Sequence, residues 1–291
     1  MSSAVRPRRS VLYMPGSNPR ALAKGRELPA DALILDLEDA VAPEAKAAGR
    51  AAIREALAEK AAYGHREIAV RVNGLDTEWG HADLAAMATV GADAILLPKV
   101  ESADMVRRAA AVLDAAGAPA ELPIWCMMET PRGILHAETI ADHPRVGCFV
   151  MGTSDLTKDL LARHTPTRLP MLPSLGICLL AARAAGIGIV DGVYLDLDDA
   201  QGFAASCAQG RDLGVDGKTL IHPKQIEAAN DAFGPSAEAV ALARRQIDAY
   251  AAALEAGQGV AVLDGKLVEN LHVQEAERLV ALAEQIAQRG A

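Results

Sequence analysis

Charged side chains recur along this chain at the ends of apolar segments, where a buried strand would stop. The densest group is Asp36, Glu38 and Asp39, three carboxylates within four residues of an otherwise apolar run. Arg71 and Asn73 lie two residues apart and therefore share one face of an extended strand. Six further candidates follow apolar runs: Lys99, Glu101, Glu129, Asp155, Asp191 and His222. Each unpaired buried charge costs several kcal/mol, so this pattern indicates chemistry rather than stability.

Carboxylates outnumber bases in this set, which predicts a bound cation that neutralises them. Oxygen ligands favour a hard ion, and two carboxylates with waters and substrate oxygens suit octahedral Mg²⁺. Zinc is disfavoured because His222 is the lone imidazole of the set and neither HxH nor HExxH occurs. Glu129 follows wholly apolar neighbours, so metal ligation explains it better than helix capping. The planar fork of Arg71 suits a substrate carboxylate.

Structural roles compete with these chemical ones. Asp36, Glu38 and Asp39 would also form a capping and salt-bridge cluster before a helix at residues 43–44, and Asp36 alone is better explained in that way. Arg71 would serve equally well as the partner of the same carboxylates.

Lys99 also has two explanations. A Schiff-base lysine needs a lowered pKa, whereas an acidic surrounding raises the pKa of an amine. An ion pair with Glu101 or another nearby carboxylate therefore explains Lys99 better.

Eight short apolar or alternating runs must position these side chains, and Ala-rich stretches with helical spacing separate them. The predicted strands are residues 10–16, 32–40, 67–74, 94–101, 124–130, 148–155, 187–194 and 217–223. Eight strands in strict alternation with helices predict a closed (β/α)₈ TIM barrel, an α/β fold whose active site lies at the carboxyl ends of the strands. A doubly wound open sheet is the alternative, but no GxGxxG follows the first strand.

Residues 1–232 account for the barrel, and residues 233–291 form a C-terminal helical extension. We expect a long helix near 237–256, a Gly-rich strand-like turn at 257–265 and a final amphipathic helix at 272–288. One stripe of that helix is more apolar than a free tail should expose: Val273, Ala276, Leu279, Val280, Ala283 and Ile286. The stripe predicts packing on a neighbouring subunit of a cyclic oligomer, with packing on its own barrel as the alternative.

Composition narrows the class of protein. The 291 residues, 51% of them hydrophobic, suffice to bury one large core. The net charge of −9 disfavours nonspecific nucleic-acid binding, and no apolar run approaches the roughly 18 residues of a membrane span. The cysteines show no paired or zinc-like spacing: Cys126, Cys148, Cys178 and Cys207. We expect a soluble, cytoplasmic protein with reduced thiols and with no nucleic-acid or membrane partner.

Six segments, in order along nearly the whole chain, resemble the citrate lyase β-subunit-like family, which includes the malyl-CoA and citramalyl-CoA lyases. They are LYMPGSNPR (12–20), LILDLEDAV (33–41), RVN (71–73), LPKVE (97–101), MET (128–130) and IHP (221–223). The resemblance implies a Mg²⁺-dependent CoA-ester lyase. Such an enzyme reversibly cleaves a carbon–carbon bond of a malyl-CoA-like or citramalyl-CoA-like thioester, giving an acyl-CoA and a 2-oxo acid.

The same resemblance implies roles for individual residues. Glu129 and Asp155 would be the Mg²⁺ ligands, with Glu129 also contacting the substrate. Arg71 would bind the carboxylate of the keto or hydroxy acid. Glu38 and Asp39 would hold metal-bound waters.

Two further regions carry implied roles. Tyr13, Arg20 and Lys24 match positions that contact CoA. Many relatives place an aspartate after the Asp-Gly-Lys turn of the tail, reaching into a neighbouring subunit's site, whereas this chain has Glu269. The longer carboxylate would take the same part in the chemistry, but it disfavours thioester hydrolysis as a second activity. A homotrimer or a dimer of trimers is expected.

Three other functions remain open on the same barrel. They are CoA-thioester hydrolysis, a metal-dependent 2-oxo-acid aldolase without CoA, and a citrate lyase-type subunit that acts on an acyl carrier protein. Residues 158–172, a long loop after the sixth strand, would shape the choice of acid.

Overall fold

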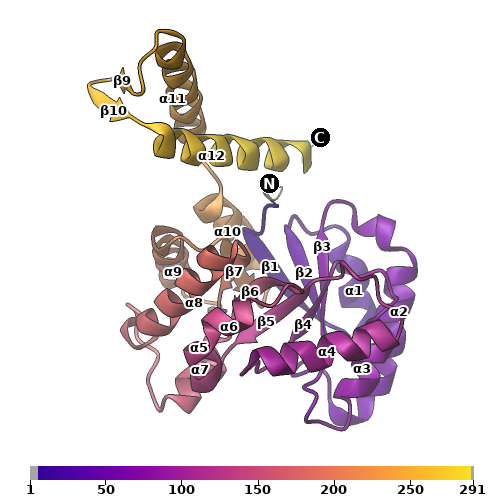
Figure 1. The fold of residues 1–291 in the computed structure, drawn as a ribbon. Helices are drawn as coiled ribbons and strands as arrows, with labels where there is room; N and C mark the ends of the chain where they lie inside the picture. Colours follow the sequence, from indigo (N-terminus) through magenta and orange to yellow (C-terminus); the bar gives the residue numbers. More distant parts are fainter. Residues whose placement is uncertain (1–5, 290–291) are drawn as a thin grey trace. The chain divides into compact units, whose positions relative to one another are not determined.

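The computed structural model describes residues 6–289, which form two compact units (Figure 1). One unit spans residues 8–233, and the other comprises residues 234–289 with residues 6–7. The larger unit is a closed barrel of eight parallel strands arranged in chain order. The predicted (β/α)₈ barrel is therefore confirmed.

The strands lie where the sequence predicts them but end earlier. They are β1 (Ser10–Pro15), β2 (Ala32–Asp36), β3 (Glu67–Arg71), β4 (Ala94–Leu97), β5 (Ile124–Met128), β6 (Val146–Met151), β7 (Gly188–Asp191) and β8 (Gly217–Leu220). Pairing of β1 with both β2 and β8 closes the ring. Each prediction runs past the observed carboxyl end, because the polar residues there leave the hydrogen-bonded ladder and form the loops of the barrel mouth.

Helices fill the connections between the strands (Figure 1). The α-helices are α1 (Pro19–Gly25), α2 (Lys46–Ala58), α3 (Gly80–Met87), α4 (Ala103–Ala115), α5 (Pro131–Leu135), α6 (Ala137–Ala141), α7 (Thr153–Asp159), α8 (Leu172–Ala185), α9 (Ala200–Leu213) and α10 (Ile226–Phe233). Short 3₁₀ turns are η1 (Pro43–Ala45), η2 (Lys60–Tyr63), η3 (Leu169–Met171) and η4 (Pro223–Gln225).

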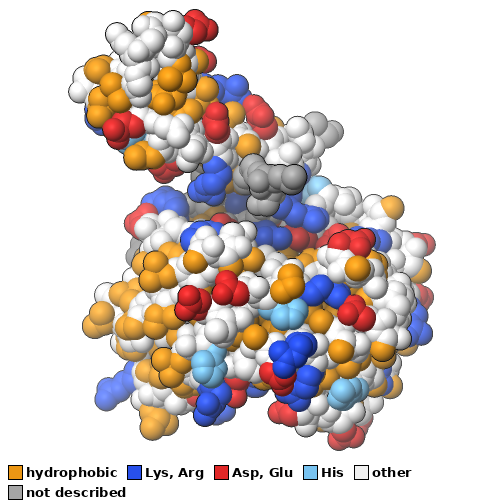
Figure 2. Space-filling model, viewed as in Figure 1, with side chains coloured by type: hydrophobic (Ala, Val, Ile, Leu, Met, Phe, Trp, Pro, Cys, Tyr) orange, Lys and Arg blue, Asp and Glu red, His pale blue; other side chains and the backbone are white. Residues whose placement is uncertain are grey.

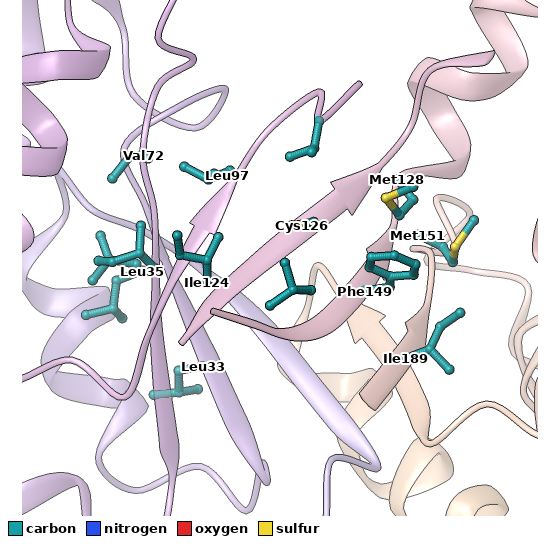
Figure 3. Packing of buried hydrophobic residues seen from close by; sticks show 14 of the residues in the cluster. Leu33, Leu35, Val72, Leu97, Ile124, Cys126, Met128, Phe149, Met151 and Ile189 are labelled. Carbon is teal, nitrogen blue, oxygen red and sulfur yellow. The ribbon is translucent and has the colours of Figure 1, made fainter. Parts of the chain in front are cut away.

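Alternation along each strand separates two apolar layers. One face packs between the strands and the helices, as with Leu35, Cys126 and Phe149 (Figure 3). The other face fills the barrel interior with residues such as Ile34, Ala69, Trp125, Met127 and Val150. Because side chains alternate along a strand, the residue two positions after an inward-facing residue also points into the barrel. Asp36, Arg71 and Glu129 each follow an inward-facing residue by two positions, at the carboxyl end of a strand, and so lie together at the mouth of the barrel.

The amino-terminal end of the barrel is closed by Arg8. Its guanidinium lies 5.0 Å from the centroid of the Trp125 ring and donates two hydrogen bonds to Glu67, at 2.7 and 2.9 Å. Arg8 is thus a structural residue, and the open end of the barrel is the one where the strands finish.

The smaller unit contains α11 (Ala237–Glu255), an antiparallel hairpin of β9 (Ala261–Leu263) and β10 (Lys266–Val268), and α12 (Asn270–Arg289). The predicted C-terminal helices are therefore present, and the strand-like turn is this hairpin. α12 lies along α11, and two residues of its apolar stripe, Val273 and Ala276, are buried. The other four residues of the stripe are half-buried: Leu279, Val280, Ala283 and Ile286. Exposed apolar side chains gather instead around the hairpin (Figure 2): Leu254, Val260, Val262, Leu267 and Leu271.

Two further observations bear on the class of protein. All four cysteines are buried and unpaired. No helix within residues 6–289 has both the length and the apolar character that crossing a membrane requires.

Candidate active site at the barrel mouth

A cavity of about 350 Å³ opens at the carboxyl ends of the strands. Its walls include five residues predicted from the sequence, together with Asp36: Tyr13, Asp39, Arg71, Glu129 and Asp155. These residues come from β1, the loop after β2, β3, the end of β5 and the start of α7. Segments far apart in the sequence therefore contribute to one site, as expected for a barrel of this type.

Arg71 lies beside Asp36 because β2 and β3 pair these two residues directly. Arg71 donates from Nε and Nη2 to the two Asp36 oxygens at 2.7 and 2.6 Å, while its guanidinium stacks 4.9 Å from the Tyr13 ring centroid. Nη1 lies 2.8 Å from Glu38 Oε2 and 3.5 Å from Asp39 Oδ2. Burial alone would lower the pKa of Arg71, but the carboxylates raise it well above its ordinary value.

The contacts with Asp36 show that Arg71 has a structural role as the partner of a buried carboxylate. The Nε–Nη2 edge is occupied by Asp36 and Nη1 already contacts Glu38, so a substrate carboxylate in the cavity would have to share the Nη1 side with Glu38. Asp36 also accepts backbone hydrogen bonds from Glu38 and Ala40, at 2.8 and 3.1 Å, which stabilise the turn after β2. Asp36 therefore belongs to a turn and an ion pair. The cap of the following turn is Ala42, without a side-chain hydrogen bond.

Glu129 is buried at the end of β5, with 2% of its surface exposed. Its Oε1 accepts a hydrogen bond from the Lys99 backbone N–H at 2.7 Å. Burial raises the pKa of Glu129 to about 7; the positive charge of Lys99 opposes the rise, and the charges of Glu38 and Asp155 add to it. A bound cation would relieve this unfavourable burial of charge.

Lys99 forms the ion pair that its acidic surroundings predict. Its Nζ lies 2.8 Å from Glu38 Oε1 and 3.4 Å from Asp155 Oδ2. The partner is not Glu101, which lies 3.8 Å from Arg132. Burial alone would lower the pKa of Lys99, but the hydrogen bond and charge of Glu38 raise it, with smaller contributions from Glu129 and Asp155. The amine therefore stays protonated, which disfavours the Schiff-base alternative.

The fit of this site to Mg²⁺ can be judged from its oxygens. Within residues 6–289, no three His, Cys, Asp or Glu side chains converge closely enough to hold a metal by themselves. Glu129 and Asp155 nevertheless share the cavity, and no described residue donates a hydrogen bond to Glu129 Oε2. A Cβ on Gly152 would lie 2.3 Å from that oxygen, so glycine keeps the space around it free. Two carboxylates with open positions suit Mg²⁺, which retains waters and binds substrate oxygens.

The residues that resemble CoA contacts divide between cavity and surface. Tyr13 lines the cavity at the end of β1. Arg20 and Lys24 are exposed on α1, four residues apart and so on one face of the helix. Lys24 pairs with Glu27 at 2.6 Å. Asn18 begins the helix by accepting a hydrogen bond from the Ala21 N–H.

Other polar residues at the strand ends have structural partners. Asp191 is buried between Lys218 Nζ at 2.9 Å and Arg168 Nη1 at 2.6 Å, so it anchors the loop after α7. Asn73 donates to the Leu37 carbonyl and to Asp83. The exposed His222 accepts a hydrogen bond from the Lys224 N–H and caps η4.

The sequence did not single out two features of the site. Gly152 and Thr153 line the cavity, and Thr153 with Val193 also borders a second cavity of about 400 Å³ beside the 158–172 loop. Neither Gly152 nor Thr153 carries a charge, so the search for charged strand ends could not find them. Glu269 lies in the smaller unit, half-buried at the start of α12, where its backbone N–H donates to His272 Nδ1.

The fold and this site together define a (β/α)₈-barrel enzyme with an acidic, arginine-containing mouth. Residues 9–223 match the family model described as HpcH/HpaI aldolase/citrate lyase, and the chain belongs to that family. The resemblance noted in the sequence is thus confirmed.

Similar proteins cover nearly the whole chain. A Cereibacter sphaeroides (strain KD131) protein named (3S)-malyl-CoA thioesterase is 55% identical over 99% of this chain and 98% of its own length. The citrate lyase subunit beta of Escherichia coli (strain K12) is 36% identical over 96% and 94%. The CitE protein of Mycobacterium tuberculosis, solved with magnesium, acetoacetate and coenzyme A, is 30% identical with a TM-score of 0.76, over 97% of this chain and 99% of that one.

Proposed function

We propose that this chain is a Mg²⁺-dependent enzyme that hydrolyses the thioester of (3S)-malyl-CoA or a close analogue. The observation that carries the proposal is the 55% identity, across 99% of the chain, to a protein named (3S)-malyl-CoA thioesterase. In the sequence analysis, Glu269 in place of an aspartate disfavours thioester hydrolysis. The 55% identity over nearly the whole chain outweighs that single substitution. The cavity with Glu129, Asp155 and Arg71 suits a substrate that carries a 2-hydroxy acid, with its hydroxyl and carboxylate groups.

The reaction adds one water across the thioester. The bond between the carbonyl carbon and sulfur breaks, the water oxygen stays on the acid, and the thiol leaves as CoA. A Mg²⁺ ion held by Glu129 and Asp155 would polarise the substrate oxygens and lower the pKa of a bound water. Arg71 orients the free carboxylate through Nη1, and Glu38 with Asp39 accepts hydrogen bonds from ordered water. Glu269, contributed by a neighbouring subunit, takes a proton from the attacking water and passes it to the departing thiolate, which leaves as the CoA thiol.

Carbon–carbon cleavage is the second candidate. The 36% identity to a citrate lyase subunit beta and the segments that resemble the family's lyases support it. In this reaction malyl-CoA would give acetyl-CoA and glyoxylate, with no water consumed. Action on an acyl carrier protein has the support only of the more distant, citrate lyase-named relatives.

We propose the same small ligands that were solved with the M. tuberculosis protein, namely magnesium and CoA. Tyr13 in the cavity and Arg20 with Lys24 on α1 are the proposed CoA contacts. We also propose a homotrimer or dimer of trimers. The exposed apolar residues around the β9–β10 hairpin support an interface there with a neighbouring subunit. The buried, unpaired cysteines are consistent with a cytoplasmic protein.

The test is a product analysis of the full-length protein. (3S)-malyl-CoA and citramalyl-CoA are incubated with Mg²⁺ or with EDTA, and CoA, acetyl-CoA and the free acids are separated by chromatography over time. Hydrolysis predicts free CoA and malate in equal amounts, with no acetyl-CoA at early times. Early formation of acetyl-CoA with glyoxylate would support carbon–carbon cleavage instead. Full turnover in EDTA would contradict the proposed dependence on Mg²⁺.

A further inference from the structure

Lys99 touches both residues proposed to bind the metal. Its backbone N–H donates to Glu129 Oε1 at 2.7 Å, and its Nζ lies 3.4 Å from Asp155 Oδ2. The same ammonium lies 2.8 Å from Glu38 Oε1. One residue therefore joins three carboxylates that come from three different strand ends.

The backbone at Lys99 is unusual. Its φ is +48°, a left-handed conformation that costs a residue with a Cβ about 1–2 kcal/mol. A glycine would adopt it freely. The chain directly after Lys99 is held, since the Val100 N–H donates to the Met127 carbonyl at 3.2 Å. The ion pairs of the ammonium offset the cost of keeping a side chain at this position.

Among residues 6–289, no other positively charged side chain lies between Glu38 and Asp155. Arg71, the nearest alternative, has its Nε and Nη2 occupied by Asp36 and reaches Glu38 from the other side. Lys158, on the same helix as Asp155, is 78% exposed and pairs with Asp159. The charge between Glu38 and Asp155 is therefore that of Lys99.

We propose that the Lys99 ammonium is a built-in counter-ion of the metal-free site, which holds Glu38 and Asp155 together and competes with the divalent cation for Asp155. The inference rests on the proposed function in one respect, the metal site at Glu129 and Asp155. It assigns Lys99 a positioning role, in which binding of the ion requires the ammonium to withdraw. Removing the positive charge should therefore tighten metal binding rather than weaken it.

The expected size follows from Coulomb's law. Two unit charges about 4 Å apart interact by about 1 kcal/mol even in a water-like medium, and a divalent ion doubles this term. An apparent affinity gain of at least about fivefold is thus expected for Lys99→Met. Lys99→Arg keeps the charge and should stay near the wild-type affinity.

The experiment is a calorimetric titration of Mn²⁺, as a probe for Mg²⁺, into the metal-free full-length protein without any CoA ester. The proteins are wild type, Lys99→Met, Lys99→Arg, Lys99→Gly and the control Lys158→Met. Lys99→Gly keeps the N–H to Glu129 and relieves the backbone strain, so it provides a second charge-free variant if Lys99→Met folds poorly. Tighter binding in both charge-free variants, with Lys99→Arg and Lys158→Met close to wild type, is the expected result.

Unchanged or weaker binding in the charge-free variants would overturn the inference while leaving the metal site standing. Equal tightening in Lys158→Met would also overturn it, since the effect would then be one of general surface charge. Absence of Mn²⁺ binding in the wild type would contradict the proposed metal site and the inference together.

Discussion

At the scale of single residues, Arg71 combines two tasks. Two of its nitrogens neutralise the buried Asp36, and the third faces Glu38, Asp39 and the cavity. A charged hydrogen bond inside a protein stabilises by about 1.5–3 kcal/mol, so these contacts matter for folding as well as for binding. The alternatives left open by the sequence, substrate clamp or structural partner, are thus not exclusive.

The substitution Arg71→Lys separates the two tasks in part. A lysine keeps the charge but cannot hold both oxygens of Asp36 and also reach a substrate carboxylate. We expect kcat/KM to fall about 100-fold and the free energy of unfolding to fall by about 2 kcal/mol. Steady-state kinetics and urea unfolding measure the two effects. Arg107→Lys on the exposed face of α4 is the control, and an Arg71→Lys variant with unchanged kcat/KM would remove Arg71 from substrate binding.

At the scale of elements, the strand and helix pattern was predictable from the sequence. The ion pairs of Arg71 and Lys99 with nearby carboxylates were predictable too, but the partners of Asp191 were not. Short apolar or alternating runs located all eight strands, because a parallel strand covered on both faces needs a nearly continuous apolar run. Asp191 looked like a residue of the active site, yet it pairs with Arg168 and Lys218. Arg168 lies in a loop with no periodicity, so no sequence pattern indicates where its side chain goes.

The cluster around Asp191 predicts a pH effect on stability. Burial alone would raise the pKa of Asp191, but the charges of Lys218 and Arg168 lower it below its ordinary value. The ionised form thus stabilises the fold above about pH 4, and this contribution is lost as the pH falls through the lowered pKa. Asp191→Asn should cost about 3–5 kcal/mol at pH 7, because it leaves buried cations unpaired.

Urea unfolding of both proteins between pH 7 and pH 3 measures this difference. The gap between wild type and Asp191→Asn should narrow as the pH falls below about 4, because the Asp191 carboxylate then becomes protonated in the unfolded chain while it stays ionised in the folded protein until its lowered pKa is reached. A gap that stays constant down to pH 3 would contradict the assignment.

The start of α7 makes a second prediction at this scale. A Cβ on Gly152 would lie 2.3 Å from Glu129 Oε2, so Gly152→Ala must displace the carboxylate or the backbone. We expect Mn²⁺ affinity to fall by at least tenfold and stability to fall by about 1–3 kcal/mol. The control is Gly176→Ala in α8, where no atom lies within 4 Å of the added Cβ, and it should be neutral or stabilising. Unchanged Mn²⁺ affinity in Gly152→Ala would argue against Glu129 Oε2 as a ligand.

At the scale of the whole molecule, the proposed site needs two chains. Glu129 belongs to the barrel unit and Glu269 to the smaller unit, and the proposal pairs them across a subunit boundary. The family resemblance suggested the sharing of Glu269, and the apolar stripe of α12 suggested packing on a neighbouring subunit; two residues of that stripe, Val273 and Ala276, are buried within the smaller unit. The exposed apolar residues around the hairpin also support contact with a neighbouring subunit.

Mixing two inactive variants tests the shared site. Glu129→Gln and Glu269→Gln proteins are each expected to lose more than 99% of the activity. When subunits exchange at random, about one site in four combines an intact Glu129 with an intact Glu269 from the neighbour. Recovery of about a quarter of the wild-type activity after refolding together is expected. No recovery, or a monomer by light scattering, would contradict the sharing of Glu269.

The central claim is the metal site at Glu129 and Asp155. A crystal structure of the protein soaked with Mg²⁺ and glyoxylate tests it most directly. The account predicts an octahedral ion about 2.1 Å from one oxygen of each carboxylate, with waters and the oxo acid completing its shell. An ion bound elsewhere, or oxo acid held in the cavity without a metal beside Glu129, would contradict it.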